Sequence, residues 1–329
     1  MSFPYYTGNP LNRRQDKPAE LPGSRRARQT DPAGYLPDKG LVDAVNVALL
    51  LGQPLLVTGE PGTGKTQLAH SLAWELGFDA PQIFETKSSS SARDLFYGYD
   101  TLSRFHAAQT GEGSKASLDY LTWHALGIAI LQSRPFADVE QWLTKDFLYN
   151  GPRRSVVLID EIDKAPRDFP NDLLNEVENL YFRVPELGNT RIAASEEMRP
   201  ILVLTSNSEK NLPEAFLRRC VYYNIPFPDR NRLTDIVMAR VGSFENSDSP
   251  LLSEALELFI KLREPGSGLR KRPATAELIG WLIALNEMGA AAKEPLKNHG
   301  AKALASLSTL IKRADDQETA RRIVENWLK

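Results

Sequence analysis

The stretch Gly59-Glu-Pro-Gly-Thr-Gly-Lys65-Thr66 decides how this sequence folds. It matches the phosphate-loop pattern G-x-x-x-x-G-K-[ST] at every required position. The apolar run Pro54–Thr58 precedes it, and the helical pattern Gly64–Leu76 follows it and is closed by Gly77. A strand, a glycine-rich loop and a helix in this order make a unit that binds phosphate groups. We therefore expect an α/β fold built around this loop.

The residue types of the loop predict a nucleotide site for ATP with Mg²⁺. Gly62 and Gly64 allow the backbone to curl so that its N–H groups point at phosphate oxygens, and the helix N-terminus adds partial positive charge. Lys65 is expected to reach the β- and γ-phosphates, and the Thr66 hydroxyl is expected to bind Mg²⁺. The predicted nucleotide-binding residues are Gly59, Glu60, Pro61, Gly62, Thr63, Gly64, Lys65, Thr66, Gln67 and Asp160.

Further apolar runs predict the rest of a sheet. They are Gln82–Thr86, Ser155–Ile159, Ile201–Thr205 and Val221–Ile225. Because helical patterns separate the runs, we expect a mostly parallel sheet with helices on both faces. A helix is expected at Leu41–Leu51, and another at Leu118–Gln132.

The sequence also predicts three regions. Residues 1–40 are rich in Pro, Gly and Arg and include the pairs Arg13-Arg14 and Arg25-Arg26, so we expect an irregular N-terminal arm. Residues 41–228 would form the α/β domain. After Pro228 strand patterns stop and helical patterns follow, so residues 229–329 would form a small all-α domain with helices at Leu251–Arg263, Ala274–Asn286 and Glu318–Leu328.

Two carboxylates follow the strand pattern that ends at Ile159. Ligands of open α/β sheets bind beyond the carboxyl ends of the strands, which is where the phosphate loop lies. Asp160 is therefore expected to bind Mg²⁺, directly or through water, and Glu161 to orient and deprotonate the water that attacks the γ-phosphate. Asn207 ends the run Ile201–Thr205-Ser-Asn and is expected to hydrogen-bond the attacking water or the γ-phosphate, although Ser-Asn is also ordinary turn sequence.

With these motifs the sequence resembles the AAA+ ATPases over about residues 35–290. The phosphate loop, the stretch Leu158-Ile-Asp-Glu-Ile-Asp-Lys-Ala-Pro-Arg-Asp168 and Thr205-Ser-Asn207 resemble the MoxR branch of that family. The resemblance implies a P-loop NTPase fold of the AAA+ type, with a parallel sheet covered by helices on both faces and a small all-α lid domain after it. It also implies hydrolysis of ATP.

The resemblance implies a ring of identical subunits, usually six, with ATP at the subunit interfaces. An arginine of one subunit would then reach the γ-phosphate bound by its neighbour. Arg219 matches the usual position best and Arg218 is the second choice; as an alternative, both are ordinary surface arginines. A second sensor arginine is expected before a lid helix, at Arg272 beside Pro273, with Arg270 hard to separate from it.

Two further groups of residues take a role from the resemblance. Tyr35 and Leu36 are expected to pack on adenine, with ordinary packing at a domain edge as the alternative. Residues 87–150 exceed what one helix and one strand need, and MoxR relatives carry an insert here that projects toward the ring pore. Phe96, Tyr97 and Tyr99 of this insert are candidate contacts for a substrate or partner, or else core aromatic residues.

Composition limits the class of partner. The 40 Lys and Arg against 42 Asp and Glu give a formal net charge of −2, so no global positive field attracts nucleic acid or anionic lipid. The sequence has one cysteine and no run apolar enough to cross a membrane, which indicates a cytoplasmic protein.

The function implied by the resemblance is a MoxR-like chaperone. Such a motor remodels or activates a protein client, and the client of MoxR relatives often contains a von Willebrand factor A domain. A nucleic-acid-dependent motor or loader subunit is the alternative, since the basic arm could bind nucleic acid. A third hypothesis, an ATP-binding switch with little turnover, conflicts with the presence of Lys65, Asp160 and Glu161 together.

Overall fold

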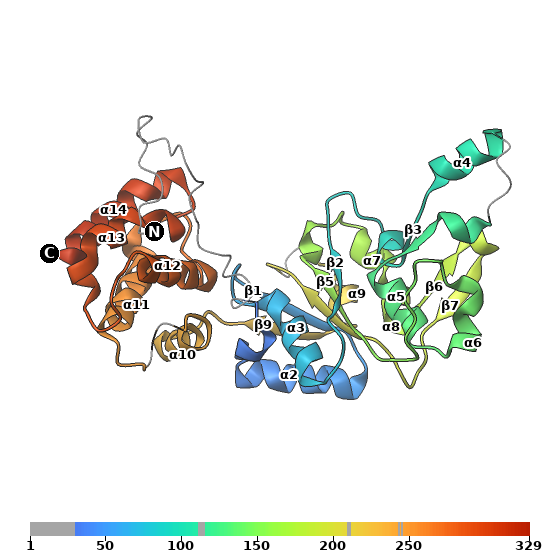
Figure 1. The fold of residues 1–329 in the computed structure, drawn as a ribbon, viewed down its shortest axis with the longest axis horizontal. Coiled ribbons are helices and arrows are strands. Elements are labelled where there is room, and N and C mark those ends of the chain that lie inside the picture. Colours follow the sequence, from blue (N-terminus) through green and yellow to red (C-terminus); the bar gives the residue numbers. More distant parts are fainter. Residues whose placement is uncertain (1–29, 111–115, 209–211, 243, 245) are drawn as a thin grey trace, which may run out of the picture. The chain divides into compact units, whose positions relative to one another are not determined.

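The computed structural model describes residues 30–110, 116–208, 212–242, 244 and 246–329 (Figure 1). Both arginine pairs of the predicted N-terminal arm lie outside these ranges. Contacts between residues divide the chain into two units, which we describe separately. One unit runs from Pro37 to Pro226, and the other combines the residues up to Leu36 with Phe227–Lys329.

All five predicted core strands form, and they build one parallel sheet in the unit Pro37–Pro226. The order across the sheet is β2-β5-β8-β1-β9, and the strands are β1 Leu55–Gly59, β2 Gln82–Glu85, β5 Val156–Asp160, β8 Ile201–Thr205 and β9 Val221–Ile225. Because the strands are parallel and in register, their carboxyl ends meet at one edge. Glu85 pairs with Asp160 there, and Val57 pairs with Thr205.

Apolar side chains cover the sheet on both faces, as the continuous apolar runs predict. On one face Leu56, Ile159 and Leu204 belong to the same core cluster as Leu126 and Ile130 of helix α5 (Ala125–Gln132). The alternate residues of these strands point to the opposite face and are equally buried. That face is in contact with α3 (Lys65–Glu75), which touches β1, β5 and β8. The predicted fold class, a P-loop NTPase sheet between helices, is confirmed.

Shorter elements complete this unit. Helix α2 (Lys39–Leu51) contacts β1 and β9, and it starts two residues before the predicted helix because Asp38 caps it by accepting from the N–H of Leu41. The two-stranded antiparallel sheets are β3 (Tyr97–Tyr99) with β4 (Leu121–Trp123) and β6 (Tyr181–Val184) with β7 (Thr190–Ala193). The remaining helices and 3₁₀ turns are η3 Ala92–Leu95, α4 Thr101–Thr110, η4 Ser117–Tyr120, α6 Phe136–Val139, η5 Glu140–Trp142, η6 Ile162–Lys164, α7 Phe169–Asp172, α8 Leu174–Asn179, η7 Pro185–Leu187 and α9 Glu214–Leu217.

The single helix predicted at Leu118–Gln132 is wrong in its first half. The turn η4 and strand β4 occupy residues 117–123, and the helix begins only at Ala125. Strand β4 forms because it pairs with β3, whose residues lie more than 20 positions earlier in the sequence. A pairing between distant segments overrides the local helical pattern.

The aromatic cluster of the predicted insert is mostly core. Phe96 and Tyr97 are buried; the Phe96 ring stacks on Phe182 with 4.9 Å between centroids, and the Tyr97 hydroxyl donates to Glu186 at 2.9 Å. Of the two alternatives predicted for these residues, a core position is therefore confirmed for Phe96 and Tyr97, and an exposed contact for a substrate or partner is not. Exposed apolar residues of this region include Leu102 and Phe105 on α4, a helix that stands apart from the parallel sheet in Figure 1, and also Phe136 and Leu148.

Gly127 allows helix α5 to lie against the turn before β3. A Cβ atom at this position would lie 2.1 Å from the carbonyl oxygen of Phe96, a backbone atom that a side-chain rotation cannot move away. We expect Gly127→Ala to lower the free energy of unfolding by about 1–3 kcal/mol, although alanine favours helices. Urea denaturation would measure the change. The control is Gly266→Ala, where a Cβ atom meets nothing within 4 Å, and an equal loss in both variants would contradict this account.

The second unit is helical. Its α-helices are α10 Arg230–Arg240, α11 Pro250–Arg263, α12 Thr275–Glu287, α13 Gly300–Ala305 and α14 Ala314–Leu328, and its 3₁₀ turns are η2 Pro32–Gly34, η8 Pro265–Ser267, η9 Leu296–His299 and η10 Leu307–Thr309. The helices surround a separate apolar core in which Phe259 and Trp281 are completely buried. Within the described residues, no helix combines the length and the apolar character that crossing a membrane requires.

Candidate functional site

The phosphate loop lies between β1 and α3 at the carboxyl edge of the sheet. Gly59, Gly62 and Gly64 all have positive φ angles, of 147°, 80° and 91°, which residues with a side chain rarely adopt. A Cβ atom on Gly59 would also lie 2.9 Å from the carbonyl oxygen of Ile225. The loop is tightened by Thr63, whose hydroxyl donates to the carbonyl oxygen of Glu60 at 2.8 Å. The glycines therefore leave backbone N–H groups at the start of α3 available for an anion.

Lys65 is the first residue of α3, and its ammonium group lies inside the curve of the loop. It donates to the carbonyl oxygens of Gly59 at 2.8 Å and Glu60 at 3.1 Å, and to Oδ1 of Asn207 at 3.1 Å. Only 7% of the residue is exposed, and this burial lowers its pKa although nearby carboxylates, led by that of Asp163, act to raise it. A buried cation with three oxygen acceptors is well placed to exchange one of them for a phosphate oxygen.

Asp160 ends β5 beside Thr66. The Thr66 hydroxyl lies 3.0 and 3.1 Å from the two carboxylate oxygens of Asp160, and Oδ1 of Asp160 also accepts from the hydroxyl of Thr205 at 2.6 Å. A hydroxyl and a carboxylate are the hard oxygen ligands that Mg²⁺ prefers. These residues fit a site that supplies two protein ligands and leaves the others to water and phosphate. In the described part of the chain, no cluster of three or more His, Cys, Asp or Glu side chains could hold a metal ion by itself.

Glu161 follows Asp160 in an unusual backbone conformation. Its φ of 55° and ψ of 50° fall in the left-handed region, and the next residues form the turn η6. Its N–H donates to the Thr205 hydroxyl at 2.9 Å, and its carboxylate forms an ion pair with Lys164. Hydrogen bonding to this carboxylate raises the pKa of Lys164. The partly exposed carboxylate of Glu161 therefore remains accessible to water, and its charge acts on the ammonium group of Lys65 in the phosphate loop.

Asn207 follows β8 and contacts the segments that follow both neighbouring strands, α3 after β1 and η6 after β5. Besides accepting from Lys65, it donates its backbone N–H to Oδ1 of Asp163 at 3.2 Å. Gln67 lies one position beyond Thr66, and its side-chain oxygen is buried without a hydrogen-bond partner among the described residues. The residues predicted from the loop and from the ends of β5 and β8 thus come together at one edge of the sheet.

The two arginines predicted to act on a neighbouring subunit differ in their surroundings. Arg219 forms an ion pair with Glu178, with 2.8 Å from its Nε to Oε2, and also donates to the carbonyl oxygen of Ala215 at 2.9 Å. Arg218 pairs with Glu214, one helical turn earlier, and its side chain is 80% exposed. Both lie just before β9, in the same unit as the phosphate loop.

The remaining predicted site residues belong to the helical unit. Arg272 is exposed, whereas Arg270 pairs with Asp315 at 3.0 Å. The helix predicted at Ala274–Asn286 is α12, which begins at Thr275, so both Arg272 and Pro273 precede it. Helix α12 starts there because the side chain of Glu277 accepts from the N–H of Ala274 at 3.0 Å. Leu36 is exposed, and its carbonyl oxygen accepts from Arg232 at 2.6 Å.

Sequence reasoning did not identify three residues of the site. Thr205 bonds both Asp160 and Glu161, Asp163 accepts from Asn207, and Lys164 pairs with Glu161. Thr205 could have been found because it ends a predicted strand at the same edge as the phosphate loop. The spacing of Asp163 and Lys164 carried no comparable signal, because their contacts depend on the left-handed backbone of Glu161.

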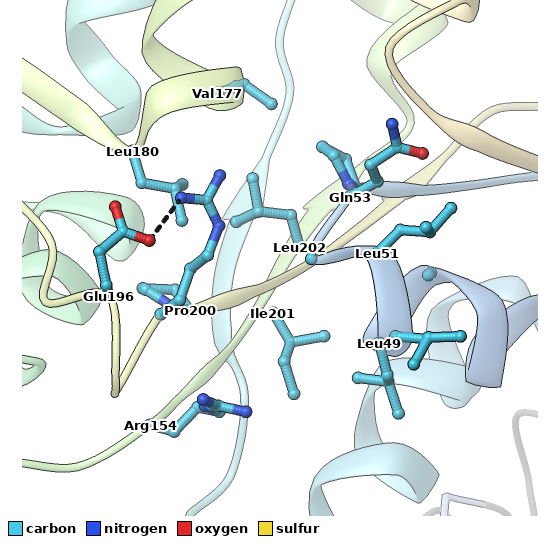
Figure 2. Close-up of a pocket in the computed structure, with 15 residues that line it drawn as sticks. Leu49, Leu51, Gln53, Arg154, Val177, Leu180, Glu196, Pro200, Ile201 and Leu202 are labelled. Carbon is cyan, nitrogen blue, oxygen red and sulfur yellow. Dashed lines mark ion pairs between the residues drawn. The ribbon is translucent and has the colours of Figure 1, made fainter.

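A pocket of about 300 Å³ lies at the opposite edge of the sheet, where the strands begin (Figure 2). Its lining includes Leu51, Gln53, Ile201 and Leu202, and an ion pair between Glu196 and Arg199 lies at its side. The pocket shares no residue with the phosphate-loop site.

The family model of the "ATPase family associated with various cellular activities (AAA)" matches residues 55–227, which is more than half of the chain. None of the curated proteins matches. Among solved structures, a mutant of RuvB from Thermotoga maritima is similar, with 18% sequence identity and a TM-score of 0.41 over 88% of this chain and 68% of that chain.

Proposed function

Since the chain belongs to the ATPase family associated with various cellular activities (AAA), we propose that it binds ATP with Mg²⁺ and hydrolyses the γ-phosphate bond. The observation that carries this proposal is the convergence of Lys65, Thr66, Asp160, Glu161 and Asn207 at one edge of the sheet. The loop alone would support nucleotide binding. The carboxylates of Asp160 and Glu161 beside it support a site for hydrolysis.

Each of these residues has a distinct role in the proposed reaction. Lys65 neutralises charge on the β- and γ-phosphates, and the N–H groups of the loop and of the start of α3 orient them. Thr66 and Asp160 would hold Mg²⁺, which, when bound, neutralises phosphate charge and favours departure of the leaving group.

The other two residues, Glu161 and Asn207, act on the attacking water. Glu161 accepts a proton from the attacking water, and Asn207 hydrogen-bonds that water or the γ-phosphate. The ion pair with Lys164 does not prevent this, because exposed ion pairs contribute little free energy and the Glu161 carboxylate can therefore leave it at low cost.

We also propose that the active form is a homo-oligomeric ring, with a hexamer as the expected size. In this arrangement Arg219, or Arg218 as the second choice, stabilises the γ-phosphate bound by the next subunit. The Arg219–Glu178 pair is partly exposed, so Arg219 can leave it at small cost. The high exposure of Arg218 makes it equally accessible to a neighbour.

Mixed rings test which arginine acts in trans. We expect Arg219→Ala and Lys65→Ala each to be inactive as uniform rings, because the first lacks the arginine and the second lacks the phosphate ligand. Mixing the two should restore part of the ATPase rate, since some interfaces then combine an intact Lys65 with an intact Arg219. The matched comparison is a mixture of Arg218→Ala with Lys65→Ala. Rescue with Arg218→Ala alone would transfer the role to Arg218, and rescue with neither would contradict catalysis in trans.

For the work that hydrolysis drives, we propose remodelling of a protein client, as in a MoxR-like chaperone. The exposed Leu102 and Phe105 on α4 support a protein partner, because exposed apolar side chains side by side on a helix favour protein contacts. A client with a von Willebrand factor A domain remains part of this proposal by resemblance alone. Arg272, with Arg270 as the alternative, and the adenine contacts of Tyr35 and Leu36 also remain predictions.

The alternative function, a nucleic-acid-dependent motor or loader, is separated from this proposal by ATPase rates measured with and without DNA. We expect ATP hydrolysis in the absence of DNA and little change on addition of single-stranded or duplex DNA, because the formal net charge is −2. Strong stimulation by DNA that weakens as salt increases would contradict client remodelling and favour the alternative.

A further inference from the structure

Thr205 occupies the junction between the two strands that carry the predicted catalytic groups. It is the last residue of β8, which lies between β5 and β1, and its side chain is completely buried. Its single hydroxyl donates to Oδ1 of Asp160 at 2.6 Å and accepts from the N–H of Glu161 at 2.9 Å. One side chain therefore holds the last residue of β5 and the residue that follows the strand.

The chemistry of the groups fixes the direction of both hydrogen bonds. An ionised carboxylate can only accept, and a backbone N–H can only donate. The hydroxyl has one proton, which it gives to Asp160, and it uses a lone pair for Glu161. This arrangement satisfies both partners in a site where an unpaired polar group would be unfavourable.

The bond to Glu161 supports a backbone conformation that is rare for residues with a side chain. Glu161 has a φ of 55°, and this left-handed turn ends β5 and sets the direction in which its carboxylate leaves the chain. The carbonyl oxygen of Glu161 is held as well, because it accepts from the N–H of Lys164 at 2.9 Å. The Thr205 hydroxyl accepts from the N–H of Glu161, so a side chain of the neighbouring strand β8 also holds this turn.

We propose that Thr205 is a positioning residue that fixes the carboxylate of Asp160 and the backbone of Glu161 relative to each other. It thereby couples the group that would hold Mg²⁺ to the group that would accept the proton of water. This inference rests on the proposed ATP hydrolysis and deepens it, since it identifies what aligns the two carboxylates.

Thr205→Val tests the inference, because valine keeps the shape and the strand preference of threonine and removes only the hydroxyl. Loss of a group that orients a metal ligand typically weakens metal binding by about 10- to 100-fold. In the wild type, we expect Mg²⁺ to increase the affinity for a fluorescent ATP analogue. We expect this Mg²⁺-dependent gain in affinity to be smaller by about tenfold or more in Thr205→Val. The affinity measured in EDTA should stay unchanged, and kcat should fall by about 10- to 100-fold. Thr205→Ser retains the hydroxyl and should preserve both the Mg²⁺-dependent gain and kcat.

Thr58→Val is the matched control for stability. Thr58 is completely buried in the adjacent strand β1, and its hydroxyl also makes two side-chain contacts, with Tyr222 at 2.9 Å and Asn224 at 3.1 Å. Neither partner belongs to the predicted site. We expect Thr58→Val and Thr205→Val to lower the melting temperature similarly, while Thr58→Val leaves the Mg²⁺-dependent gain and kcat intact.

The outcomes separate this inference from the proposed function. If Thr205→Val matches Thr58→Val in kcat and in the Mg²⁺-dependent gain, Thr205 has no positioning role. If Thr205→Val does not fold, Thr205→Ser tests the inference in its place. Loss of the Mg²⁺-dependent gain in affinity in Thr205→Ser, which keeps the hydroxyl, would overturn the inference. A wild-type protein that hydrolyses no ATP would instead contradict the proposed function itself.

Discussion

Glu161→Gln is expected to bind ATP as the wild type does and to lose nearly all turnover. Glutamine keeps the size and the hydrogen-bonding shape of the side chain, but it cannot accept the proton of the attacking water at neutral pH. General-base catalysis typically contributes about 10²- to 10⁴-fold, so kcat should fall within this range. Release of inorganic phosphate measures the loss, and the affinity for a fluorescent ATP analogue measures the retained binding.

The matched control for this variant is Lys164→Gln. It breaks the same ion pair from the other side and leaves the Glu161 carboxylate in place. We expect Lys164→Gln to keep turnover close to that of the wild type, so that the loss in Glu161→Gln can be assigned to the missing base. If Glu161→Gln hydrolyses ATP at the normal rate, Glu161 is not the general base.

Lys65→Ala is expected to abolish tight ATP binding. The ammonium group is buried in the loop, and charge-assisted hydrogen bonds to phosphate contribute about 1.5–3 kcal/mol each. One such bond corresponds to a Kd that is weaker by about 10- to 100-fold, since every 1.4 kcal/mol is tenfold. Titration with a fluorescent ATP analogue in the presence of Mg²⁺ measures the change.

The control for Lys65→Ala is Lys39→Ala. Lys39 is an exposed lysine at the start of α2, and it pairs with Asp43, which is not a residue of the predicted site. Its removal changes the net charge by the same amount and should leave the Kd unchanged. An equal effect of both variants would mean that Lys65 acts through overall charge and not through a contact with phosphate.

Most of the parallel sheet could be predicted from the sequence because its strands are buried on both faces. Such strands appear as continuous apolar runs, for example Val156–Ile159 and Ile201–Leu204, and the glycine-rich loop fixes the position of the first of them. The rule that parallel strands end at one edge then predicts that Asp160 and Asn207 lie near the phosphate loop, and the structure shows Asp160 bonded to Thr66 and Asn207 bonded to Lys65.

The region between β2 and β5 could be predicted less well, because its structure depends on contacts between distant segments. Strand β4 exists through its pairing with β3, and the buried positions of Phe96 and Tyr97 depend on Phe182, more than 80 residues later. Local patterns contain no information about such partners. The position of Thr205 at the end of a predicted strand places it near the phosphate loop, but its hydrogen bonds to both Asp160 and Glu161 are seen only in the structure.

The central claim is that the phosphate loop and the Asp160–Glu161 pair form one site that hydrolyses ATP. Its most direct test is phosphate release from ATP by the purified chain of 329 residues, measured over a range of protein concentrations with Mg²⁺ or with EDTA, and with Glu161→Gln in parallel. The account predicts multiple turnovers that require Mg²⁺, with a rate per chain that rises as the protein concentration increases and rings assemble. Phosphate release no faster than that of Glu161→Gln at every concentration would contradict it.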